Sequence, residues 1–181
     1  LVNILGVDPG LGSTGYGVIE ANGNRVTIRE GGAIRGGASS LPLEVRLSTL
    51  YDALSEVLLE YRPSAVAVEQ IYSHYNYPAT AVIMGHARGV IALAAAKASV
   101  PLFNYSSTQV KHVLVGHGRA SKIQVQKAIQ ARLKLPDIPE PNDVADALAL
   151  AVCHWQISSG AQMINEALGT AQKLRRSASH L

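Results

Sequence analysis

The order of strand-like and helix-like segments is the feature that most constrains the fold of this chain. Three apolar segments suited to β-strands come first, over Val2–Asp8, Thr14–Ala21 and Arg25–Ile34. The second and third are joined by Asn22-Gly23-Asn24, and Asn-Gly between two strand-like segments is a strong signal for a tight hairpin. We therefore expect the chain to begin with an antiparallel meander of three strands.

Helices and strands alternate after the meander. Apolar spacing predicts, in order, a helix over Leu43–Tyr61, a strand over Ser64–Glu69, a helix over Ala79–Ser99 and a strand over Val100–Tyr105. Three further helices are predicted over Gln109–Val115, Ser121–Leu133 and Asn142–Ser158. A crossover through the first helix would return the chain beside the first strand, so Val2–Asp8 and Ser64–Glu69 should be parallel neighbours. The predicted fold class is α/β, a five-stranded mixed sheet with helices on both faces.

Composition limits the class of protein. Apolar residues make up 48% of the 181 residues, enough for a packed core, and we expect one domain over residues 1–158. The longest apolar runs have seven residues, against the ~20 that span a bilayer, which predicts no membrane helix. A single cysteine, Cys153, excludes a disulfide framework and a thiolate metal cluster. We expect a cytoplasmic protein, with residues 159–181 forming a partly disordered C-terminal tail.

A glycine-rich segment at Gly10–Gly15 matches the G-x-G-x-x-G pattern of dinucleotide-binding proteins. That pattern works only when a helix follows, because the helix N-terminus holds the pyrophosphate. Here a strand-like segment follows, so the glycines are better explained as a tight turn between strands.

Four carboxylates carry a stronger signal. Asp8 and Glu69 each end an apolar strand, and parallel neighbouring strands bring such ends to one edge of the sheet, where ligand sites of α/β proteins lie. Asp143 and Asp146 share one face of a helix, because they are three residues apart. Simpler explanations exist for single members: an Asx-type turn for Asp8, a solvent-reaching strand end for Glu69, and a helix-dipole contact for Asp143.

Convergence of the four would favour a metal site. Two like charges ~4 Å apart repel by ~4 kcal/mol at an effective dielectric near 20, so clustered carboxylates take up protons or recruit cations. Hard oxygen ligands favour Mg²⁺, with Mn²⁺ as a substitute, and two such ions per site suit in-line displacement at a phosphodiester. Asp8, Glu69, Asp143 and Asp146 are therefore the candidate metal ligands and catalytic residues.

Basic and aromatic residues near these acids suit a nucleic acid. Six cations and no acid lie between residues 111 and 134, namely Lys111, Arg119, Lys122, Lys127, Arg132 and Lys134. A solvated helix face is the alternative explanation. Tyr72, Tyr75 and Tyr77 follow Glu69 closely and could stack on unpaired bases, or could cap the core instead. Lys122 follows Ser121 at a predicted helix start, where the backbone favours an anion, so it is the candidate for stabilising transition-state charge.

The chain resembles the RuvC family of Holliday junction resolvases. The resemblance rests on segments that occur in order over residues 2–158: Gly6-Val7-Asp8-Pro9-Gly10, Thr14-Gly15-Tyr16-Gly17-Val18-Ile19, Ala67-Val68-Glu69-Gln70, His86-Ala87-Arg88-Gly89, Gln109-Val110-Lys111, Val115-Gly116-His117-Gly118 and Asp143-Val144-Ala145-Asp146-Ala147-Leu148-Ala149. The ordered set is specific, although the Asp-Pro-Gly opening alone is shared by other ribonuclease H-like proteins.

The resemblance implies a ribonuclease H-like nuclease domain and a homodimer. It further implies paired Mg²⁺-dependent nicks on opposing strands of a four-way DNA junction during recombination and repair, and partnership with the RuvA–RuvB branch-migration complex. The family's acidic tetrad falls on Asp8, Glu69, Asp143 and Asp146, and its catalytic-region lysines fall on Lys111 and Lys122, which we expect to hold the scissile or adjacent phosphate. Its base-contacting aromatic falls on Tyr72, and we add Arg119 as a candidate DNA contact.

Two other functions stay open at the level of sequence. One is a ribonuclease H-like nuclease with another substrate, such as an RNA–DNA hybrid or a DNA end. The other is a non-catalytic junction-binding module with structural carboxylates. The surface that forms the dimer is also open: Gly85 and Gly89 permit close approach of a second helix, but they could equally pack on the protein's own sheet.

Overall fold

The computed structural model describes residues 1–70 and 78–178, with residues 162–178 described as helix backbone. Its sheet has the order β3-β2-β1-β4-β5, formed by β1 (Val2–Asp8), β2 (Thr14–Asn22), β3 (Arg25–Ile34), β4 (Ala65–Glu69) and β5 (Leu102–Tyr105). The first three strands are antiparallel, whereas β4 runs parallel to β1 and to β5. Both the predicted meander and the predicted parallel crossover are confirmed.

Five helices complete the described chain, namely α1 (Leu43–Tyr61), α2 (Pro78–Lys97), α3 (Ser107–Val115), α4 (Lys122–Leu133) and α5 (Asn142–Ala178). Apart from the end of α5, the predicted elements agree with these to within two residues. No helix follows Gly10–Gly15, because β2 begins at Thr14, which removes the dinucleotide-binding interpretation.

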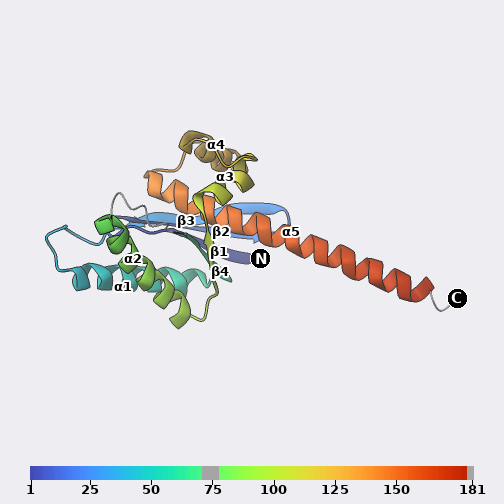
Figure 1. Ribbon diagram of the computed structural model, residues 1–181, viewed down its shortest axis with the longest axis horizontal. Helices are drawn as coiled ribbons and strands as arrows, with labels where there is room; N and C mark the ends of the chain where they lie inside the picture. The colour runs from blue at the N-terminus through green and yellow to red at the C-terminus, as the bar shows by residue number, and fades with distance from the viewer. Residues whose placement is uncertain (71–77, 179–181) are drawn as a thin grey trace.

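The predicted end of the last helix was wrong. We expected it at Ser158, but α5 continues to Ala178. Figure 1 shows the reason, since the C-terminal half of α5 projects away from the sheet and needs no apolar stripe facing a core. Its sequence is rich in Ala, Gln, Leu and Arg, all of which have high helix propensity. The division into a domain over 1–158 and a tail over 159–181 stays a prediction.

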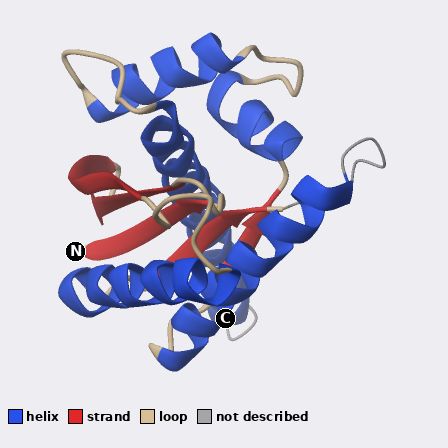
Figure 2. Ribbon diagram, turned by 90° about the vertical axis from the view of Figure 1, so that its left-hand side faces the viewer, coloured by secondary structure: helices blue, strands red, loops and turns tan. Residues whose placement is uncertain are grey.

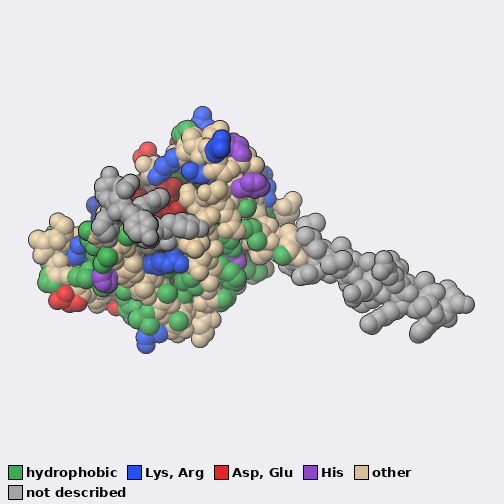
Figure 3. All heavy atoms as spheres, in the orientation of Figure 1, with side chains coloured by type: hydrophobic (Ala, Val, Ile, Leu, Met, Phe, Trp, Pro, Cys, Tyr) green, Lys and Arg blue, Asp and Glu red, His purple; other side chains and the backbone are tan. Residues whose placement is uncertain are grey.

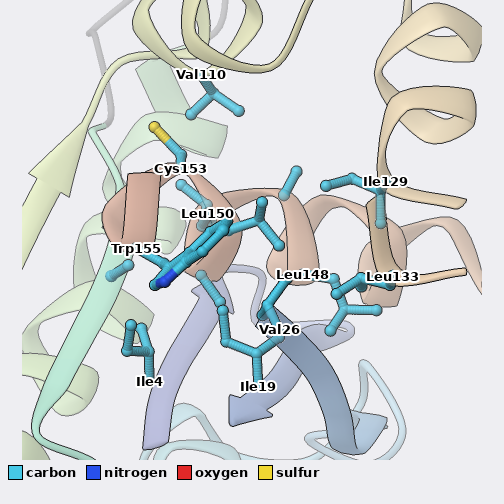
Figure 4. Packing of buried hydrophobic residues seen from close by; sticks show 14 of the residues in the cluster. Ile4, Ile19, Val26, Val110, Ile129, Leu133, Leu148, Leu150, Cys153 and Trp155 are labelled. Carbon is cyan, nitrogen blue, oxygen red and sulfur yellow. The ribbon is translucent and has the colours of Figure 1, made fainter. Parts of the chain in front are cut away.

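Two separate cores lie on the two faces of the sheet, with helices on both sides (Figure 2). Side chains of a strand alternate between faces. In β1, Ile4 faces the core made with α3, α4 and α5, whereas Leu5 and Val7 face the core made with α1 and α2. Figure 4 shows the first of these cores, where Leu148 of α5 lies over Ile19 and Val26 of the meander.

Helix α2 is more apolar than its position requires. Within the described chain, Ala79–Lys97 is long and apolar enough to cross a membrane by length and composition, and 22% of that window is buried. The length of uninterrupted apolar runs did not predict such a helix, because isolated polar residues such as His86 interrupt a segment that is apolar on average. The helix buries Ala87 and Ile91 in the core that it shares with α1 and the sheet.

Candidate active site

The strand pleat directs two carboxylates to the same face of the sheet. Asp8 is two residues beyond Gly6 and four beyond Ile4, so it shares their face, the one covered by α5. Glu69 likewise shares the face of Ala67, which packs in the same core. Because β1 and β4 are parallel neighbours, both carboxylates lie at the carboxyl edge of the sheet, under the start of α5.

Close packing of α5 on the meander brings two more carboxylates to this edge. A Cβ on Gly6 would lie 1.9 Å from the Ala147 carbonyl oxygen, and one on Gly15 would lie 2.1 Å from the Asp143 carbonyl oxygen. Only glycine lets the helix backbone approach the strands this closely. Asp143 and Asp146, in the first turns of α5, therefore lie beside the ends of β1 and β2.

Two capped helices supply the lysines. The Ser106 hydroxyl accepts a hydrogen bond from the Gln109 N–H at the start of α3, which carries Lys111. Ser121 and Gln124 form a capping box at the start of α4, which places Lys122 in its first turn. The predicted helix start beside Lys122 is thus confirmed.

These elements enclose a cavity of about 210 Å³, lined by Asp8, Glu69, Ser107, Val110, Lys111, Lys122, Val125, Asp146, Ala149 and Leu150. Figure 3 shows acidic side chains recessed below α3 and α4, with basic side chains beside them. The cavity thus gathers three of the four predicted carboxylates and both predicted lysines.

Burial and mutual repulsion both disfavour ionisation of the acids at the site. The pKa of Asp8 is raised to about 7, mainly by burial and further by the charges of Glu69, Asp146 and Asp143, while Lys122 opposes the rise. Burial and the Asp146 charge also raise the pKa of Glu69, against the lowering effect of the two lysines. The carboxylates therefore act on one another as a cluster.

Two of the carboxylates are held by protein donors. The Lys122 ammonium donates to Asp146 Oδ2 at 2.7 Å, and the Ser13 hydroxyl donates to Asp143 Oδ2 at 2.6 Å. As placed, no three Asp, Glu, His or Cys side chains within the described residues form a group that could hold an ion. The donor set still fits a hard divalent cation, because an ion can replace the ammonium at Asp146 and relieve the repulsion at Asp8.

Of the remaining predicted site residues, Asp143 and Arg119 are described and neither lines the cavity. Asp143 is half-buried at its margin, close enough for its charge to raise the pKa of Asp8. Arg119 is exposed in the turn between α3 and α4 and does not line the cavity. Tyr72 lies outside the described residues, so its role stays a prediction.

Two contributors were not predicted from the sequence. Ser107 lines the cavity, and Ser13 holds Asp143. The Ser106-Ser107 pair before a helical segment is a recognisable capping signal that could have indicated the first. Nothing local indicates the second, since Ser13 and Asp143 are far apart in the chain and only the packing of α5 brings them together.

Comparison with known proteins places this arrangement in a family. A family model described as "Crossover junction endodeoxyribonuclease RuvC" matches residues 4–154. The RuvC of Rhodopirellula baltica is 50% identical over 150 residues, covering 83% of this chain and 84% of that protein. The RuvC of Desulforamulus reducens is 46% identical over 156 residues, covering 86% of this chain and 94% of that protein.

Solved structures agree. The structure titled "T. thermophilus RuvC in complex with Holliday junction substrate" superposes with a TM-score of 0.82 at 32% identity, covering 89% of this chain and 97% of that one. The yeast mitochondrial Holliday junction resolvase Ydc2, at 15% identity and a TM-score of 0.60, shares the fold. The ordered motifs, the ribonuclease H-like sheet and these matches agree, and the chain belongs to the RuvC family of crossover junction endodeoxyribonucleases.

Proposed function

We propose that this protein resolves four-way DNA junctions by paired, divalent-metal-dependent nicks during recombination and repair. One observation carries the proposal: acids from β1, β4 and α5 meet two lysines in one cavity at the carboxyl edge of the sheet. Repulsion among acids costs folding stability, and a site for cations beside a phosphodiester gives that arrangement a function. Membership of the RuvC family supports junction DNA as the substrate.

The chemistry follows from the residues at the cavity. Asp8, Glu69, Asp143 and Asp146 would hold two Mg²⁺ ions, or Mn²⁺ in their place. Such ions supply Lewis acidity for in-line attack on the phosphodiester. Lys111 and Lys122 line the cavity beside the acids, and at the start of α4 the Lys122 ammonium is joined by backbone N–H groups that favour an anion. We assign both lysines to the scissile or adjacent phosphate, and Lys122 to stabilising transition-state charge.

Two further residues would recognise the junction. The exposed Arg119 suits a phosphate at a distance from the cut, and Tyr72 suits stacking on an unpaired base at the junction centre. Partnership with a RuvA–RuvB branch-migration complex rests on the family resemblance.

We further propose that α2 forms the homodimer. Its outward face carries Val82 and Leu93, whose side chains are 60% and 50% exposed. Gly85 and Gly89 on the same face have open space where a Cβ would be, so they do not pack on the protein's own sheet. A second copy of α2 could approach closely over this stripe. An apolar surface there also accounts for the high apolar content of the helix.

A cleavage assay on a four-way junction, with and without Mg²⁺, tests the proposed function. We expect symmetric nicks in opposing strands only with the ion, and no nicks with Asp146→Asn at an unchanged junction affinity. Asp137→Asn is the matched control, because Asp137 is an exposed acid away from the cavity. Cleavage by Asp146→Asn at the normal rate would contradict the proposed chemistry.

The same assay separates the alternatives. Preference for an RNA–DNA hybrid or a DNA end over the junction, compared at equal salt, would indicate another ribonuclease H-like nuclease. Tight junction binding with no product at any divalent ion concentration would indicate a binding module.

A further inference from the structure

Arg88 of α2 reaches the strand end that carries Glu69. One guanidinium nitrogen donates a hydrogen bond to the Glu69 backbone carbonyl, and the other terminal nitrogen donates to the Asn104 side-chain oxygen of β5. The arginine thus connects a helix on one face of the sheet with two adjacent strands at the carboxyl edge. Neither the family resemblance nor the proposed chemistry gives this residue a role.

The Glu69 carbonyl is a peptide group that the sheet leaves partly unsupported. Pairing between β1 and β4 ends at Val7 and Val68, so Glu69 has no partner in β1. On the other side, Glu69 is in register with Tyr105, and the Gln70 N–H donates to the Tyr105 carbonyl at 2.8 Å. Arg88 therefore supplies a second anchor for the peptide unit between Glu69 and Gln70, where β4 ends.

The shape of the guanidinium suits this task. Its two terminal nitrogens lie in one plane at a fixed spacing and can hold acceptors on two strands at once, which a lysine ammonium on a flexible stem cannot do with the same geometry. Among the described residues, no carboxylate lies within ion-pair distance of Arg88. Its described partners are neutral, so the contact fixes backbone position without neutralising the acids of the site.

We infer that Arg88 is a positioning residue, which clamps the end of β4 to β5 and so fixes the Glu69 carboxylate in the cavity. The effect of Arg88 on catalysis rests on the proposed function. Its effect on the position of the β4 end rests on the observed hydrogen bonds alone. Because Gly85 and Gly89 flank Arg88 on α2, the clamp also links the proposed dimer helix to the catalytic edge of the sheet.

Kinetics on a four-way junction test the catalytic consequence. Arg88→Ala should lower kcat on the order of 100-fold, the cost typical of a misplaced catalytic group, while junction Kd without divalent ion stays within about twofold. Arg88→Lys and Asn104→Ala should each lose about tenfold in kcat, because each keeps one of the two contacts. Lys97→Ala, which removes an exposed charge from the same helix, should match the wild type.

Amide hydrogen exchange tests the structural consequence without relying on cleavage. The Gln70 amide should exchange at least about tenfold faster in Arg88→Ala, whereas the Leu5 amide in the core should exchange at the wild-type rate. An unchanged Gln70 rate would overturn the inference, as would a junction Kd that weakens in parallel with kcat, since Arg88 would then be a phosphate contact. Should Arg88→Ala not fold, Arg88→Lys and Asn104→Ala answer the same questions. If the wild type does not cleave junctions, the proposed function is refuted. The exchange rate of the Gln70 amide would then still test whether Arg88 holds the end of β4.

Discussion

Ionisation of the Asp8 carboxylate lowers the folding stability of the protein. The pKa of Asp8 is about 7 in the folded chain, because of burial and of three acidic neighbours, against an ordinary value of 3.8. Between these two pH values the folded chain keeps a proton that the unfolded chain has released. Folding stability therefore falls as the pH rises through this window, and the full penalty is present above about pH 7.

Asp8→Asn should consequently stabilise the ion-free protein at alkaline pH. We expect a gain of about 2 kcal/mol at pH 8, less than the full pKa shift implies because Asp8 is partly solvated, and a gain near zero at pH 4. Urea unfolding of the variant and the wild type, with a chelator present at both pH values, measures this difference in stability. Saturating Mg²⁺ should reverse the order, since an ion stabilises only the carboxylate form. Equal stabilities at pH 8 would show that neither burial nor the acidic neighbours disfavour the Asp8 carboxylate. The variant should bind junctions without cleaving them.

In the ion-free protein the Lys122 ammonium pairs with Asp146, and an incoming cation would have to displace it. We expect Lys122→Ala to bind Mn²⁺ about fivefold more tightly than the wild type, a modest change because this ion pair is partly exposed. The same variant should turn over more slowly, because the ammonium no longer stabilises the phosphate. Electron paramagnetic resonance of free Mn²⁺ measures the affinity, with Lys127→Ala on the same helix as control. Weaker Mn²⁺ binding in Lys122→Ala would mean that the ammonium supports the ion.

The contact between β1 and α5 determines whether the acids can meet. Gly6→Ala would place a Cβ against the Ala147 carbonyl, and relieving the clash would separate β1, which carries Asp8, from α5, which carries Asp146. We expect a loss of about 3 kcal/mol in unfolding free energy, as for other overpacked sites, together with a loss of cleavage. Urea denaturation checks the first effect. Gly12→Ala, with open space at its Cβ, is the control for loss of a glycine. A Gly6→Ala protein with wild-type stability would show that α5 lies farther from the strands.

The sequence predicts local features of these elements well and their mutual contacts poorly. Hairpin chemistry at Asn22-Gly23-Asn24 and apolar runs ending in Asp8 and Glu69 predict the sheet and the edge where acids meet, because each is a short-range signal. The extent of α5 was missed, since a helix that leaves the core loses its periodicity. The hydrogen bonds from Ser13 to Asp143 and from Arg88 to the Glu69 carbonyl join distant segments, and only the packed fold reveals them.

For the whole molecule, the proposed activity requires two sites. A single cavity cuts one strand at a time, whereas resolution of a four-way junction requires cuts in two opposing strands. A two-fold dimer presents two identical cavities to a substrate that is itself nearly two-fold symmetric. The outward face of α2 lies on the side of the helix opposite to Ala87 and Ile91, so a partner can bind there without disturbing the protein's own core.

Leu93→Glu should convert the protein to a monomer, because a charge in an apolar interface stays unpaired on association, while the side chain is exposed enough in one protomer to leave the fold intact. We expect sedimentation velocity to show a single monomer species. On a supercoiled plasmid with an extruded cruciform, the variant should yield nicked circles, since each binding event delivers one cut, whereas the wild type yields linear product from two. Leu59→Glu, an exposed leucine on α1, is the matched control and should remain a dimer that linearises the plasmid. If Leu93→Glu still sediments as a dimer, another face joins the protomers. If it is monomeric yet still produces linear plasmid in one binding event, paired cutting does not depend on dimerisation.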